Sequence, residues 1–224
     1  TNFDNVAFVI VDGTLKINPI TATVTIVGAN NTTSYDGAEH SVNGYTATAI
    51  TDLYDVNDNI VFNGTAATAT RTDAGTTNMG LTSEMFTNTN TNFTNVIFNV
   101  TDGYQTINPI DVTVTITGNT ATVNYDGQSH TVTGYTASCA NTLYNVNSNL
   151  TFSGEAKATR TNAGTTDMNL SESQFENTNS NFGTVFFNII DGKMTVNPIA
   201  ATVTITEHSG TANYDGNEHV VTGY

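Results

Sequence analysis

Apolar residues alternate with Thr or Asn in short runs along this chain, as in residues 112–116 (VTVTI) and 96–100 (VIFNV). Successive side chains of a β-strand point to opposite faces, so a period of two with many β-branched residues predicts half-buried strands. Further strands are predicted through Phe62 and Phe152 and in the stretches before Arg71 and Arg160. The only helical pattern, at residues 83–86 and 172–175, is one turn long. The pattern therefore predicts an all-β protein.

The chain repeats itself. The string Ile-Asn-Pro-Ile at 107–110 recurs at 17–20 and, as Val-Asn-Pro-Ile, at 196–199, so the intervals are 90 and 89 residues. A period of this length is that of one small domain, not of one solenoid turn. We expect the C-terminal part of a preceding repeat at 1–20, complete β repeats at 21–110 and 111–199, and the N-terminal part of a following repeat at 200–224. The chain is thus expected to be a piece of a longer array.

Asp-Gly dipeptides occur six times, at two positions of the repeat, and each lies between two strand patterns. An Asp-Gly pair in that setting predicts a two-residue hairpin turn that uses glycine's freedom at positive φ. Regular short strands with such turns predict tandem β-sandwich-like, Ig-like modules with Asp-Gly hairpins. The structural pairs are Asp12 and Gly13, Asp36 and Gly37, Asp102 and Gly103, Asp126 and Gly127, Asp191 and Gly192, and Asp215 and Gly216.

A His follows three of these pairs, at His40, His130 and His219, and an Asp with a His could form an acid–base pair. The predicted hairpin, however, places His130 opposite Val123 and leaves Asp126 at the tip, so the two groups are splayed apart. One His per repeat also offers too few ligands for a metal. We therefore expect no catalytic residue and no cofactor.

The acidic loop with Asp52, Asp55 and Asp58 is rich in oxygen ligands and is a weak candidate for calcium. The matching loop has Thr142, Asn145 and Ser148, and loss of carboxylates weakens binding of a hard cation. A solvated acidic loop is the expectation, and calcium between modules is the alternative.

Two arginines, Arg71 and Arg160, share one repeat position within Thr-Arg-Thr-(Asp/Asn)-Ala-Gly. The planar guanidinium suits a bond to a carboxylate or to backbone carbonyls, which we expect here, while a ligand-binding Arg is the alternative. Three prolines, Pro19, Pro109 and Pro198, mark the repeat junctions. Because Pro fixes φ and keeps the preceding residue extended, we expect stiff junctions.

The residue pattern gives little support for covalent cross-links or for an aromatic surface that binds glycans. The lysines do not share a position in all repeats, and Cys139 is matched by Ala49, so neither a Lys-Asn nor a thioester bond is expected in every repeat. Trp is absent. The recurring Phe residues are predicted to be core, which leaves Tyr45, Tyr135 and Tyr224 as the one repeated aromatic platform.

The net charge of the chain restricts the classes of partner that we expect. Twenty acidic residues against five basic ones give a net charge of −15, and only 11% of residues are charged. We therefore expect neither nucleic acid nor membrane as a partner.

Motifs spread over the whole chain resemble a known repeat type. They include Asn-Tyr-Asp-Gly, His-Thr-Val-Thr-Gly-Tyr, Thr-Arg-Thr-Asn-Ala-Gly-Thr-Thr and Thr-Asp-Gly-Tyr-Gln-Thr-Ile-Asn-Pro. This succession resembles the tandem mostly-beta and YDG-type repeats of large surface proteins of Gram-positive bacteria. Such repeats are generally regarded as stalks that hold an adhesive tip away from the cell wall.

The resemblance implies an extracellular location at the cell wall or cell surface, and a non-enzymatic structural stalk or filament shaft of an adhesin. The modules are then expected to stack end to end as an elongated rod. The expected partners are neighbouring repeats of the same chain, with neighbouring chains in a filament and a host or microbial surface ligand as further candidates. The alternative function is a multivalent glycan- or protein-binding array that acts by avidity.

Overall fold

The computed structural model describes residues 2–224 and divides into two compact units. Unit 1 runs to Val112 and also contains Asn141–Tyr144 and Thr178–Val185; the rest of the chain forms unit 2. The divisions at Val112 and Val185 fall inside two strands, β11 (Ile110–Gly118) and β19 (Phe182–Ile190). The units are therefore not delimited by the sequence repeats alone.

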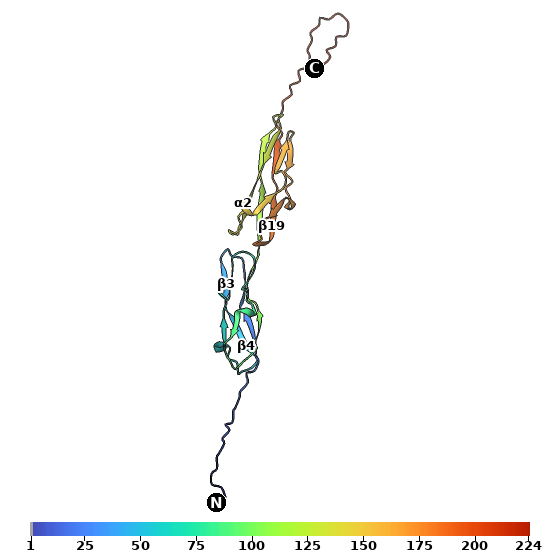
Figure 1. The fold of residues 1–224 in the computed structure, drawn as a ribbon. Helices are drawn as coiled ribbons and strands as arrows, with labels where there is room; N and C mark the ends of the chain where they lie inside the picture. The colour runs from blue at the N-terminus through green and yellow to red at the C-terminus, as the bar shows by residue number, and fades with distance from the viewer. Residues whose placement is uncertain (1) are drawn as a thin grey trace. The chain divides into compact units, whose positions relative to one another are not determined.

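The first complete repeat is built from ten short strands and two single-turn helices (Figure 1). The prediction of an all-β fold is confirmed, and the helical turn predicted near residue 83 is present, but the helix at Val56–Asn59 was not predicted. The elements are β1 (Thr23–Gly28), β2 (Asn30–Ser34), β3 (His40–Asn43), β4 (Tyr45–Ala49), α1 (Val56–Asn59), β5 (Ile60–Phe62), β6 (Thr68–Arg71), β7 (Gly75–Asn78), η1 (Ser83–Met85), β8 (Phe86–Asn88), β9 (Ile97–Thr101) and β10 (Tyr104–Asn108).

The same order of elements returns in the second repeat, where it begins with β11. The elements that follow are β12 (Thr120–Asn124), β13 (His130–Thr133), β14 (Tyr135–Cys139), α2 (Val146–Asn149), β15 (Leu150–Phe152), β16 (Lys157–Arg160), β17 (Gly164–Asp167), η2 (Glu172–Gln174), β18 (Phe175–Asn177), β19 and β20 (Lys193–Asn197).

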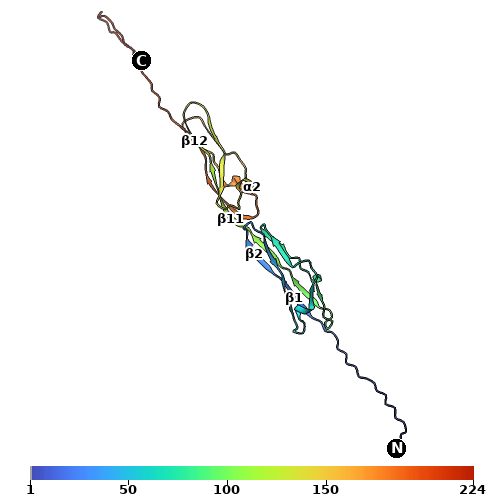
Figure 2. The same cartoon turned by 90° about the vertical axis from the view of Figure 1, so that its left-hand side faces the viewer.

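Two three-stranded sheets form the body of each repeat. In the first repeat their orders are β4-β1-β9 and β2-β10-β7, and β3-β6 and β5-β8 make two smaller sheets. β1 pairs with β9 and β2 pairs with β10, both in parallel. The chain therefore passes from the first sheet to the second twice, from β1 to β2 and from β9 to β10, and these two paths are neighbours. Figure 2 shows β1 and β2 following one another along this path.

The crossing point of these two paths requires glycine. A Cβ at Gly28 would collide with the backbone nitrogen and Cα of Gly103, and Gly118 and Gly192 meet in the same way in the second repeat. Gly103 is not in the positive-φ region; it is present because two backbones approach closely.

The predicted Asp-Gly hairpins are wrong. The strands on either side of Asp36 belong to different sheets, because β2 pairs with β10 and β3 pairs with β6. Asp126 likewise separates β12 from β13, and Asp102 separates β9 from β10, without pairing between them. Alternating polarity predicts that a strand exists but not which strand it pairs with, so turns between sheets looked like hairpins.

The core follows the period-two pattern. Val24 and Ile26 of β1 are fully buried and pack with Tyr54, Phe86 and Phe93. Burial of such a side chain contributes about 1.5–3 kcal/mol to folding. The equivalent positions of the second repeat are also buried: Val114, Ile116, Tyr144, Phe175 and Phe182.

The described residues before Ile20 and after Asn197 carry no strand, and Asp12, Gly13, Asp215 and Gly216 lie there. In residues 2–224 no helix is both long and apolar enough to span a bilayer.

Candidate functional site

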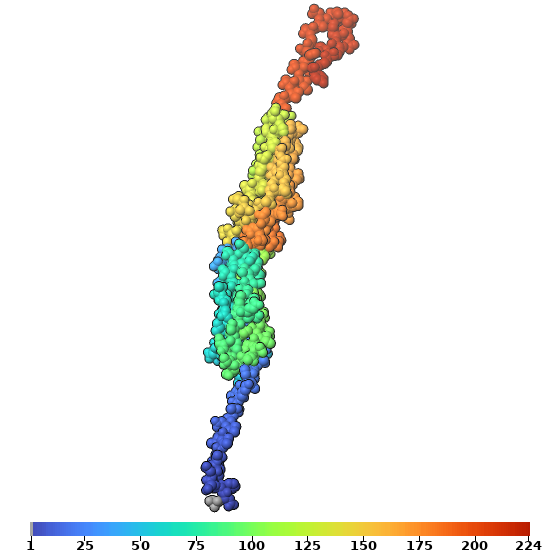
Figure 3. Space-filling view, in the orientation of Figure 1, coloured from blue at the N-terminus to red at the C-terminus, as the bar shows by residue number. Residues whose placement is uncertain are grey.

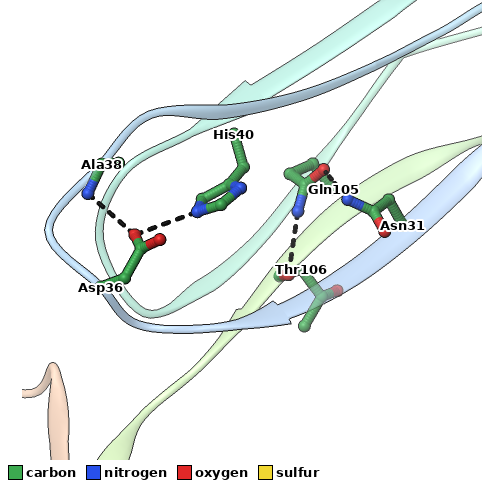
Figure 4. A network of polar contacts seen from close by, with 6 residues as sticks. All are labelled: Asn31, Asp36, Ala38, His40, Gln105 and Thr106. Atoms are coloured by element: carbon green, nitrogen blue, oxygen red, sulfur yellow. Dashed lines mark hydrogen bonds and ion pairs between the residues drawn. The ribbon is translucent and has the colours of Figure 1, made fainter.

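The turn after β2 brings an Asp and a His together (Figure 4). Oδ1 of Asp36 accepts a hydrogen bond from the backbone N–H of Ala38 at 2.9 Å and lies 3.0 Å from Nε2 of His40. The arrangement recurs at Asp126 and His130, at 2.8 Å, and at Asp215 and His219, at 3.0 Å. The prediction that these groups are splayed apart is therefore wrong, because the Asp side chain folds back over its own turn.

These hydrogen bonds stabilise the carboxylate form. The N–H of Ala38 and then the ring of His40 lower the pKa of Asp36, and the N–H of Gln128 and then His130 lower the pKa of Asp126. His40 lies opposite Arg71 on the neighbouring strand and not opposite a partner on β2.

An Asp–His pair orients an imidazole, and hydrolytic chemistry then needs a nucleophile on the other ring nitrogen. In the part of the chain that the structure describes, no other side chain hydrogen-bonds to the ring of His40 or His130. The arrangement locks the conformation of a four-residue turn, in which Gly37 and Gly127 both have φ of 80°.

Both arginines bind the loop that follows them. Nη2 of Arg71 donates to the carbonyl of Ala74 at 2.6 Å, and Nη1 donates to Oγ1 of Thr77 at 3.2 Å. Arg160 makes the same bonds to Ala163 and Thr166, at 2.8 and 3.2 Å. Backbone carbonyls are thus the partners, and neither guanidinium lies within ion-pair distance of a carboxylate among residues 2–224.

A second set of Asp residues anchors another loop. Oδ2 and Oδ1 of Asp102 accept the backbone N–H groups of Gly80 and Leu81, both at 2.9 Å. Asp191 does the same for Asn169 and Leu170. Because Leu81 and Leu170 are core residues, these carboxylates hold the end of the core in place.

The carboxylates of the acidic loop are not brought together as a group. Asp55 caps α1 by accepting from the N–H of Asn57 at 2.9 Å, and Asn145 caps α2 in the same way. Asp52 and Asp58 are exposed. Across the described residues, no three or more His, Cys, Asp or Glu side chains are grouped as metal ligands would be.

The proposed aromatic platform is wrong for two of its three members. Tyr45 packs against Phe86 with ring centroids 5.1 Å apart, and Tyr135 packs against Phe175 at 5.2 Å. Both tyrosines are half-buried, and burial raises the pKa of Tyr135. Tyr224 is exposed. Figure 3 shows one face of the surface, with the first repeat in blue to green and the second in yellow to orange.

Unit 1 contains a contact that the sequence pattern did not reveal, which we call the docking contact. Oδ1 of Asn181 accepts the N–H of Ala74 at 2.6 Å, and its Nδ2 donates to Oδ1 of Asp73 at 2.8 Å. The ring of Phe182 meets the ring of Tyr35 edge-on at 5.7 Å. Asn181 is only 6% exposed, which is low for an Asn in a loop.

Leu143 completes the docking contact. Its Cδ2 atom lies close enough to Gly37 that an added Cβ there would be 3.0 Å away. The segments 141–144 and 178–185 therefore meet both the Tyr-Asp-Gly turn and the loop that Arg71 holds. The one sequence signal for this contact is the recurrence of Asn92 as Asn181 and of Asp73 as Asn162.

The prolines lie at the ends of strands. Pro109 is the single residue between β10 and β11, Pro198 directly follows β20, and Pro19 precedes Ile20, which bridges to Phe93. Comparison with protein-family models, with curated proteins and with solved structures finds no match to the chain.

Proposed function

We propose that this chain is a segment of the structural stalk, or filament shaft, of a bacterial cell-surface adhesin. The docking contact is the observation that carries the proposal. Residues 141–144 and 178–185 come from the second sequence repeat, yet they belong to unit 1 through Asn181 and Phe182. Because loops of one repeat belong to the compact unit of the preceding repeat, the arrangement suits the neighbouring modules of a stalk.

The chain path supports the same function. β10 ends at Asn108 and β11 begins at Ile110, so there is no Gly- or Ser-rich spacer that could act as a flexible linker. Pro109 fixes its own φ and keeps Asn108 extended.

The polar side chains that recur in both repeats also make hydrogen bonds within the fold. Arg71 and Arg160 bind their own loops, Asp102 and Asp191 hold the backbone after β7 and β17, and Asp36 closes its turn. Side chains used in this way stabilise the loops of each module, which is what a spacer exposed to solvent requires.

The test replaces the repeats in the full-length adhesin, on the surface of its own cell. A shaft of unrelated β-modules of the same contour length should restore adhesion, whereas deletion of the repeats should abolish it with the tip still displayed. If the equal-length replacement does not restore adhesion, the repeats themselves bind a ligand by avidity, and the stalk proposal is wrong.

A further inference from the structure

We infer that the surface of the first repeat formed by Leu53, Asn92 and the backbone of Phe93 is a docking site for a second copy of the repeat. The part of the second copy that binds is its Tyr-Asp-Gly turn together with its Arg-held loop, which this chain presents as Tyr125, Asn162 and Ala163. This inference rests on the proposed stalk function and names its interface.

The first line of support is a difference in burial between equivalent residues. Asn181 is 6% exposed in the docking contact, whereas Asn92, at the same repeat position, is exposed. Leu143 is 37% exposed and Leu53 is 73% exposed. The two surfaces have the same residues at these positions, and that of the second repeat contacts Asp73, Ala74 and Tyr35.

The second line of support is the shape of the unoccupied surface. The N–H of Asn92 donates to Oδ1 of Asn90 at 2.9 Å, as that of Asn181 does to Asn179. The carbonyl of Asn92 accepts from Ile20 at 3.0 Å, as that of Asn181 does from Ile110 at 3.1 Å. The loop therefore already has the conformation of the docked loop, so docking would require little further ordering.

A hollow lies beside this surface. It has a volume of about 350 Å³ and is lined by Leu53, Pro19, Ile20 and the loop from Asn90 to Phe93. An aromatic ring fits a hollow lined by Leu, Pro and Ile side chains. In the docking contact, the ring that meets Phe182 is that of Tyr35.

The matching surface of the second repeat is also preformed. Arg160 holds the carbonyl of Ala163 as Arg71 holds that of Ala74, so the loop backbone is fixed in the same way. Gly127 has the φ of Gly37, 80°. Asn162 replaces Asp73, and its amide oxygen still accepts a hydrogen bond, although without the strength that a charged acceptor adds.

Between separate molecules this contact lacks the high effective concentration that a short covalent junction supplies, so a covalent trap is the suitable probe. In a Cys139→Ala background, one molecule carries Thr91→Cys and the other carries Thr161→Cys. Both residues are exposed neighbours of the contact and leave Asn92 and Asn162 intact. The two proteins are mixed and treated with a short bismaleimide, and the heterodimer is quantified by mass spectrometry.

The heterodimer should form at least several-fold more than when Thr151→Cys, an exposed position on β15, replaces Thr161→Cys. Adding Asn92→Ala to the first molecule should reduce the yield to that of the control. Circular dichroism before cross-linking shows that each variant is folded.

A pair of cysteines within one chain tests the docking contact separately from the intermolecular contact. Thr72→Cys with Ser180→Cys in one chain occupies the equivalent positions of the docking contact and should cross-link within the molecule. If this pair reacts but the intermolecular yield equals the control, the inference is overturned and the stalk proposal stands. If the internal pair also fails to react, the docking contact itself is wrong, and the proposed function loses its main support.

Discussion

Asn181 donates from Nδ2 to Oδ1 of Asp73 over 2.8 Å, and its own Oδ1 accepts the N–H of Ala74. These residues are 108 positions apart, and the bonds lie inside unit 1. One buried side chain thus satisfies both a carboxylate and a backbone donor.

Asn181→Ala should destabilise unit 1 by about 1–3 kcal/mol, because the N–H of Ala74 and the carboxylate of Asp73 would both lose a partner. The measurement is the midpoint of urea unfolding. The matched control is Asn92→Ala at the exposed equivalent position, which should change stability by about 0.5 kcal/mol or less. Equal effects of the two substitutions would contradict a specific role for the docking contact.

Gln105 is completely buried on β10, and its Oε1 accepts from Nδ2 of Asn31 on β2 at 3.1 Å (Figure 4). In the second repeat the equivalent residues are Met194 and Ala121. Gln105→Met alone should cost about 1–3 kcal/mol, because it leaves the Asn31 amide without its partner.

The double variant Asn31→Ala with Gln105→Met reproduces the second repeat and should recover most of that loss. Urea unfolding of the four proteins of this double-mutant cycle gives the coupling free energy. Additive losses would mean that the hydrogen bond is not what keeps Gln105 buried.

The Asp–His turns should make folding sensitive to acid. The folded-state pKa of Asp36 and of Asp126 is lowered, so each contributes stability that is complete above the unfolded pKa of about 3.9. Below that pH the unfolded chain binds more protons than the folded one, and the contribution is lost as pH falls through the folded pKa.

Asp126→Asn keeps an acceptor for the N–H of Gln128 but does not titrate, so its melting temperature should fall less steeply below pH 4 than that of the parent. Thermal melts across this range are the measurement. Asp58→Asn, which makes the same charge change in the exposed acidic loop and outside any Asp–His turn, is the control. A parallel shift of all three curves would show that the turn does not contribute to the pH dependence.

Gly75 combines two constraints, a φ of 128° and contact with the guanidinium of Arg71. Gly75→Ala should therefore cost more than Gly44→Ala, since Gly44 has a φ of 87° but open space where a Cβ would be. We expect about 1 kcal/mol for Gly44→Ala from backbone strain alone, and clearly more for Gly75→Ala. Thermal unfolding measures both, and similar costs would mean that the Arg71 loop adjusts freely.

The sequence was sufficient for the strands but not for their partners. Alternation identified the buried face of β11 through Val114 and Ile116, because side-chain direction in a strand depends only on neighbouring residues. The parallel pairing of β1 with β9 depends on residues more than 70 positions away, and no local pattern encodes it. The Asp-Gly dipeptides encode a bend, which serves a change of sheet as well as it serves a hairpin.

The candidate site was predicted less completely for the same reason. The repeat position of Arg71 and the chemistry of guanidinium were enough to expect a carboxylate or backbone carbonyls as partners, and the structure shows carbonyls. The role of Asn181 was not, since an Asn in a loop is usually solvated and only the fold brings Asp73 to it.

The junctions should hold successive repeats in one orientation, so that an array of them forms a stiff rod. Only Pro109 separates β10 from β11, and it fixes φ at the point where a hinge would otherwise lie. Small-angle scattering on proteins with two, three and four repeats should give a maximum dimension that grows nearly linearly with repeat number. Flexible linkers would give growth near the square root. Replacing Pro109 with Gly-Ser should shorten the maximum dimension without lowering the melting temperature of either repeat, because β10 and β11 keep their own pairing. Square-root growth in the parent series would contradict the stalk.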